Sequence, residues 1–207
     1  EGFRLSPGML TEMLQAVVYG DLLMRCLYRV RPYETVKGSG DALHSHWRSK
    51  CIEALTSKHG IKQYKSICRG IVEDFDHLPI HENMKKPRVG VVGEILVKYM
   101  PLANNHLVEL LEKEGAEAVV PDLMDFLNYS VYNNQYRSEF LGEKKTAETV
   151  SRAIIKAIAQ VRKPALEALK NSSRFDAPMP IGEIARQTRP FLSIGNQYGE
   201  GWFLTGE

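Results

Sequence analysis

The chain lacks most of the signatures that mark metal, nucleotide or disulfide-rich proteins. It has only three cysteines, which are Cys26, Cys51 and Cys68 and lie far apart. A disulfide framework uses an even, clustered set, so we expect a reducing and cytoplasmic location. There is no Cys-x-x-Cys pair, no His-Glu-x-x-His helix, no Gly-x-Gly-x-x-Gly turn and no phosphate-binding loop. Dinucleotide or ATP binding through these signatures is therefore unsupported.

Strong charge and long apolar runs are also missing. The 207 residues include 27 basic and 25 acidic side chains, for a formal net charge of +2. This balance predicts no nucleic-acid partner. No apolar run approaches the roughly 20 residues that a membrane helix needs, so no membrane partner is expected. The chain starts without methionine and stops within an apolar stretch, which favours an internal piece of a longer protein.

Residues 1–84 have the pattern of a helical region. Ser6 and Pro7 form a helix start, with serine as the N-cap and proline at the first helical position. Pro32 ends the apolar stripe that follows. Two further stripes recur at helical spacing and are closed near residues 60 and 79. We therefore expect three helices here, with the cysteines inside them.

Residues 85–207 have an α/β pattern instead. Residues 88–93 read as a short, wholly buried strand, and 117–121 and 190–194 as further strands. A helix capped at Asn104 and Asn105 separates the first two, as in a right-handed βαβ unit. Helices are expected near 123–140 and 146–171, the second kinked or divided by Pro164. The predicted fold is a Rossmann-like three-layer half-domain with a short parallel sheet, cut off at its C-terminus.

Metal binding has little support in the sequence. Cys51 and Cys68 fall on apolar stripes, where a free cysteine usually packs as a small hydrophobe. The six histidines show no ligand spacing, so a solvated surface is the better interpretation. We predict that this chain alone holds no metal and no cofactor.

Open parallel sheets bind ligands beyond the carboxyl ends of their strands. The residues that fall at such ends, or at the helix start between them, are the candidate ligand-binding residues: Gly93, Glu94, Asn104, Asn105, Asp122, Gly195, Asn196, Gly199, Gly201 and Trp202. Glycines let the backbone approach a ligand closely, so we expect the 195–201 loop to line a ligand or cluster cavity. For Asp122, a plain helix cap is an equal alternative. Glu200 is the one catalytic candidate, as a proton-transfer group, with a cap of the following helix as the alternative.

Several segments resemble one family, the acyl-CoA dehydratase activase-related proteins. They are GDLLMR at 20–25, YRVRPYE at 28–34, KPRVGVVGEILVK at 86–98, ANN at 103–105, EGAEAVVPD at 114–122, and GNQ and GEGWFLT within 195–205. In this family, ATPase activase modules are joined to a region similar to the 2-hydroxyglutaryl-CoA dehydratase subunits. The resemblance spans essentially the whole chain.

The resemblance implies part of an iron–sulfur 2-hydroxyacyl-CoA dehydratase-like lyase. In such enzymes, a 4Fe-4S cluster receives one electron from the ATP-driven activase, and a ketyl radical of the acyl-CoA expels the hydroxyl group. The implied partners are the activase and an acyl-CoA substrate. The cluster ligands of the family lie beyond both ends of this chain, so the piece alone is expected to be inactive. Two alternatives stay open: a non-catalytic docking module for the activase, and part of a double-cubane-cluster ATP-dependent reductase.

Overall fold

The computed structural model describes residues 6–57, 60–140, 142, 145–194 and 201–207. The protein is mostly helical, with 68% helix and 4% strand. The predicted Rossmann-like three-layer α/β fold is therefore wrong, because the described residues form only a two-stranded sheet. The chain divides into two compact units, and each is described by itself. The first comprises residues up to 87 with 115–117 and 161–177, and the second comprises the remainder.

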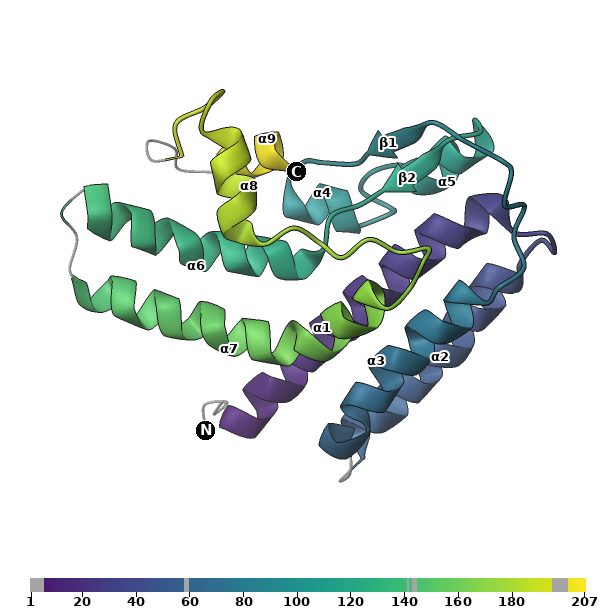
Figure 1. Ribbon diagram of the computed structural model, residues 1–207, viewed down its shortest axis with the longest axis horizontal. Coiled ribbons are helices and arrows are strands. Elements are labelled where there is room, and N and C mark those ends of the chain that lie inside the picture. Colours follow the sequence, from purple (N-terminus) through teal and green to yellow (C-terminus); the bar gives the residue numbers. More distant parts are fainter. Residues whose placement is uncertain (1–5, 58–59, 141, 143–144, 195–200) are drawn as a thin grey trace. The chain divides into compact units, whose positions relative to one another are not determined.

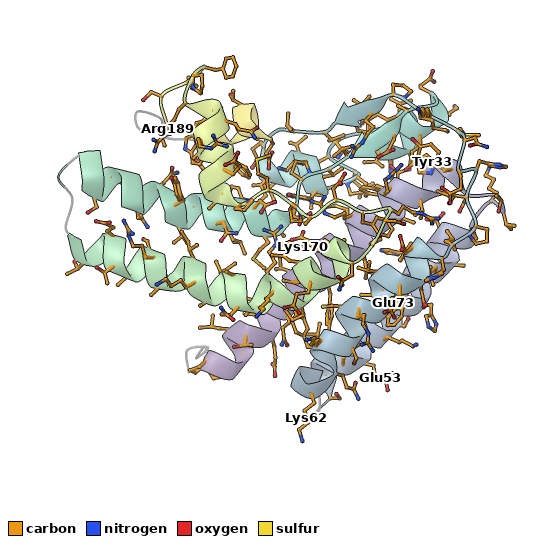
Figure 2. The ribbon with its side chains drawn as sticks, in the orientation of Figure 1. Tyr33, Glu53, Lys62, Glu73, Lys170 and Arg189 are labelled. Atoms are coloured by element: carbon orange, nitrogen blue, oxygen red, sulfur yellow. The ribbon has the colours of Figure 1, made fainter. Side chains whose placement is uncertain are left out.

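The first unit is built on three helices that pack on one another, as the sequence predicts: α1 (Pro7–Val30), α2 (Ser39–Thr56) and α3 (Gly60–Asp76). The Ser6 hydroxyl accepts from the Met9 N–H at 3.2 Å, which confirms the predicted N-cap. Figure 1 shows α2 and α3 side by side. Their outer surface is charged, and Glu53 and Lys62 extend into solvent there (Figure 2).

A tight corner links these helices. The 3₁₀ turn η1 (Arg31–Tyr33) follows α1 directly. The Glu34 carboxylate then caps α2, since it accepts from the N–H groups of Gly38 and Gly40. Glu34 also forms an antiparallel bridge with Ile80, beyond the end of α3. Backbone pairing thus joins the segment that follows η1 to the segment that follows α3.

The second unit contains most of the sheet. Strands β1 (Arg88–Gly90) and β2 (Glu117–Val119) run parallel, linked by α4 (Ile95–Tyr99) and α5 (Leu107–Lys113). The Val91 N–H donates to the Val119 carbonyl at 2.8 Å, which continues the pairing beyond β1. The predicted parallel pairing of these two segments is confirmed. Gly115, at a φ of 89°, makes the turn between α5 and β2 in the left-handed region that favours glycine.

Two details of the predicted sheet are wrong. All three residues of β1 are exposed, so this strand is not wholly buried. The third strand does not form, because the N–H groups of Phe191 and Leu192 both bond to the Thr188 carbonyl, at 2.9 and 3.0 Å. Residues 189–191 are a turn after a helix, and Phe191 is 82% exposed. Three apolar residues within four positions, Phe191, Leu192 and Ile194, fit a strand and an anchored turn equally well.

Four helices complete the chain that the structure describes: α6 (Leu123–Phe140), α7 (Lys145–Lys170), α8 (Ile181–Thr188) and α9 (Gly201–Gly206). The predicted helices near 123–140 and 146–171 are confirmed, although α7 runs through Pro164 and is not divided there. In the second unit, α8 and α9 pack together and α6 contacts α8. The buried core here includes Tyr129, Ile184, Trp202 and Phe203.

Candidate functional site

Three of the seven candidate residues with a described position lie where β1 and β2 end. Gly93 and Glu94 follow β1, and Asp122 follows β2. The Tyr99 hydroxyl at the end of α4 donates to the Pro121 carbonyl at 2.6 Å. That bond ties the segment after β1 to the segment after β2, so the structure brings these two sets of residues to the same edge of the sheet.

Glu94 has a structural role that accounts for its position. Its Oε2 accepts from the N–H groups of Leu96 and Val97, at 2.9 and 3.2 Å, and it is the N-cap of α4. Gly93 precedes it at a φ of 147°, a backbone conformation that side-chain-bearing residues rarely adopt. Together they turn the chain out of β1 and into a helix. An exposed carboxylate that already accepts two N–H groups has less capacity left for a ligand.

The two asparagines serve the next turn. The Asn104 Oδ1 accepts from the Leu107 N–H at 3.1 Å, at the start of α5. Its Nδ2 donates to the carbonyls of Val97 and Lys98, at 2.9 and 3.3 Å. Asn105 follows at a φ of 56°, in the left-handed region that asparagine tolerates. The N-cap residue of α5 is His106 and not Asn104 or Asn105, although the Asn104 side chain does bond to the first N–H of the helix, and both ends of its amide are engaged within the protein.

Asp122 differs from Glu94 because it is buried, with 3% of its surface exposed. Its carbonyl accepts from the Asp125 N–H at 3.1 Å, in the first turn of α6. Asp125 is also buried. Burying a carboxylate is costly unless it is paired or hydrogen-bonded, so Asp122 belongs to the internal framework of the edge and not to its open surface.

The remaining candidates do not join this edge as surface groups. Trp202 lies in α9 and is fully buried, and its Nε1 donates to the Asn133 Oδ1 at 3.0 Å. Its ring lies 5.2 Å from that of Tyr129. Gly201 begins the same helix, which confirms the predicted helix start near Trp202. Four candidates lie outside the described residues: Gly195, Asn196, Gly199 and Glu200.

Sequence reasoning missed a buried ion pair in the second unit. The Lys98 Nζ lies 3.0 and 3.2 Å from the two carboxylate oxygens of Glu207, and the exposed fractions of the two side chains are 2% and 1%. The ammonium group also lies 5.1 Å from the ring centroid of Tyr99 and 5.6 Å from that of Phe203. A lysine that ends an apolar run was the available signal, but its partner is 109 residues away.

A second missed cluster lies in the first unit, around Glu117. Its Oε2 accepts from the Tyr33 hydroxyl and from Arg29 Nη1, both at 2.8 Å. Glu117 is 2% exposed, and Tyr33, labelled in Figure 2, is buried as well. Burial and the bond to Glu117 raise the pKa of Tyr33 above its usual value. This cluster joins the end of α1 to the first residue of β2, which points to a positioning role.

The edge in the second unit has one more property, an excess of exposed apolar side chains. We define the apolar segment as residues 89–102. Its exposed apolar members are Val89, Val92, Leu96, Val97, Met100 and Leu102. Leu96 is 66% exposed and Leu102 is 84% exposed. Six exposed apolar side chains thus fall within one segment of 14 residues.

The three cysteines are not arranged as the ligands of a metal cluster in the part of the chain that the structure describes. All three are buried inside α1, α2 and α3. Within the described part of the chain, no three His, Cys, Asp or Glu side chains are grouped closely enough to hold a metal ion. Among those same residues, no helix is both long and apolar enough to cross a membrane.

Comparison with known proteins leaves the family open. No family model, no curated protein and no solved structure matches the chain.

Proposed function

We propose that the chain is one part of an iron–sulfur 2-hydroxyacyl-CoA dehydratase-like enzyme. The enzyme is a cytoplasmic lyase that acts on an acyl-CoA with an ATP-dependent activase, by one-electron chemistry. The support is the set of segments that resemble the activase-related family, which extends from residue 20 to residue 205. The alternative within the same group of proteins is a double-cubane-cluster ATP-dependent reductase. It would carry a different cluster and act on a different substrate.

The proposal is supported by the positions that two of the resembling segments occupy in the structure. KPRVGVVGE contains β1 and the turn after it, and EGAEAVVPD contains β2 and the turn after it. The two strands are parallel, so the turns that follow them lie at the same edge of this two-stranded sheet. In this role the chain supplies a scaffold: Glu94 and Asn104 fix α4 and α5, and Asp122 lies beneath the edge.

The experiment is to purify the natural full-length protein without oxygen and measure its iron and acid-labile sulfide. We expect both in constant ratio to the polypeptide. Turnover of a 2-hydroxyacyl-CoA should then require the activase, ATP and a reductant together. A pure, folded protein that contains no iron after anaerobic reconstitution would exclude the proposal.

A second candidate function, a non-catalytic docking module for the activase, has its own support. The apolar segment presents exposed leucine, valine and methionine side chains, a composition suited to a protein partner. The test is binding of the purified activase to a Leu96→Ser/Leu102→Ser variant. The matched control is Phe191→Ser, which removes an equally exposed apolar side chain elsewhere in the second unit. Docking through the apolar segment predicts weaker binding for the double variant only, and equal binding by all three proteins would rule it out.

A further inference from the structure

We propose that Cys26, Cys51 and Cys68 are structural thiols of the three-helix layer, and that none of them ligates iron. If the protein is the iron–sulfur enzyme proposed above, every ligand of its cluster then comes from residues other than these three cysteines. The statement about the thiols stands on the structure of the first unit alone. The statement about the cluster rests on the proposed function.

Position in the fold is the first argument. Cys26 lies in α1, Cys51 in α2 and Cys68 in α3, and their exposed fractions are 0%, 4% and 0%. These helices pack on one another, so the sulfurs lie within the apolar layer between them. Cluster ligands usually come from loops that bring several sulfurs to one point. Among the described residues, no three His, Cys, Asp or Glu side chains are grouped closely enough to hold a metal ion, so the three sulfurs do not form a ligand set.

The surroundings of the sulfurs are the second argument. The Cys68 thiol interacts electrostatically with the Tyr64 hydroxyl, one helical turn earlier in α3. The same hydroxyl donates to the Val161 carbonyl at 2.8 Å, and the Tyr64 ring lies 5.2 Å from the ring of Tyr19. Cys68 therefore lies near two tyrosines whose rings contact each other across α1 and α3. An iron–sulfur cluster at this position would displace the contact between α1 and α3.

Protonation agrees with this geometry. Burial raises the pKa of the Cys51 thiol, and that of the Cys68 thiol, to about 12. The thiolate is the form that binds metal and reacts with electrophiles. At neutral pH both groups are therefore held as neutral thiols, in the form that suits an apolar core.

The first test is the reaction of the native chain with a thiol-specific disulfide reagent. We expect the three thiols to react at least about 100-fold more slowly in the folded chain than in denaturant, since reaction requires opening of the layer. Complete reaction in denaturant is the internal control. A thiol that reacts in the folded protein as fast as in the unfolded one would overturn its assignment.

The second test uses the full-length protein purified without oxygen. Cys26→Ala, Cys51→Ala and Cys68→Ala variants should each keep the iron content of the parent. Loss of iron from a variant whose circular dichroism is unchanged would overturn the inference. If the parent itself contains no iron, the proposed function fails, and the reactivity of the thiols still decides their structural role.

Discussion

The ion pair between Lys98 and Glu207 gives the sharpest prediction about stability. Both side chains are almost completely buried, and the closest nitrogen–oxygen distance is 3.0 Å. Removing one partner leaves the other charge without compensation in a low-dielectric environment, which costs about 3–5 kcal/mol. The rings of Tyr99 and Phe203 continue to stabilise the ammonium group. We therefore expect Glu207→Gln to lower the free energy of unfolding by about 3 kcal/mol, near the lower limit of that range.

The double variant separates the ion pair from simple packing. Lys98→Met with Glu207→Leu replaces the buried charges by apolar groups, and such replacements are often neutral. Its free energy of unfolding should lie within about 1 kcal/mol of the parent, whereas each single variant is much less stable. The matched control is Arg152→Met. That substitution breaks an exposed ion pair with Glu148 in the same unit and should cost no more than about 0.5 kcal/mol.

Urea unfolding followed by tryptophan fluorescence measures these differences. Trp202 lies five residues before Glu207 in sequence and is fully buried, so its emission reports whether α9 is docked. The chain has two tryptophans, and a Trp47→Phe background leaves Trp202 as the single indole. A Glu207→Gln variant within about 0.5 kcal/mol of its parent would refute the reasoning, because that is the behaviour of a solvated pair.

Three further predictions concern other parts of the structure. Glu117→Gln should lower the free energy of unfolding by about 1–3 kcal/mol, because two short bonds to a buried carboxylate are weakened, and thermal unfolding of the variant checks it. Gly206→Ala should be destabilising, since a Cβ would meet the neighbouring side chains of α8 at 2.4 and 2.5 Å. Gly182→Ala in α8 should be stabilising, because a Cβ there meets nothing within 4 Å. Urea midpoints compare the two variants, and equal midpoints would contradict the packing. The stabilisation from the two buried thiols should be fully present below pH 9.0, and the free energy of unfolding should fall as pH rises towards about 12. The reason is that burial raises the pKa of Cys51 and Cys68, so the folded state favours the thiol. A Cys51→Ala/Cys68→Ala variant should show a smaller fall in this free energy, and an unchanged fall would refute the assignment.

Local signals accounted for the helices of the first unit. Ser6 and Pro7 fix where α1 begins, since one supplies the capping oxygen and the other needs no N–H partner. Asn104 similarly marks the start of α5 through its own side chain. The parallel pair β1–β2 was predictable because a helix between two short apolar runs requires a crossover connection. These features depend on residues close together in sequence.

One error has a local cause. Residues 190–194 look like a strand by composition, but the N–H groups of Phe191 and Leu192 bond to the Thr188 carbonyl, which makes residues 189–191 a turn. The other errors concern features that depend on distant residues. Whether β1 is buried depends on which elements cover it, and the residues of the strand itself do not carry that information. In the described part of the chain, all three residues of β1 are exposed. The pairing of Lys98 with Glu207, and of Glu117 with Tyr33, is set by tertiary packing across 109 and 84 residues. A single sequence gives no measure of such contacts.

The candidate site has a different limit, because a cap, a core residue and a ligand group can look alike in the sequence. Glu94 and Asn104 were nominated because they follow a strand or precede a helix, and in the structure their side chains accept from N–H groups at helix starts. Both roles draw on the same chemistry, an oxygen acceptor beside free N–H groups. Trp202 was nominated for its place beside glycines, but its ring fills the aromatic core of the second unit. Distinguishing a cap or a core residue from a ligand group requires knowing what surrounds it.

The most direct test of the account compares iron in two proteins prepared side by side without oxygen. One is the natural full-length polypeptide, and the other is the 207-residue chain alone. After identical reconstitution with iron and sulfide, we predict stoichiometric iron in the first and a colourless, iron-free second protein. Iron bound stoichiometrically by the 207-residue chain would contradict the assignment of its cysteines, and no iron in the full-length protein would contradict the proposed enzyme.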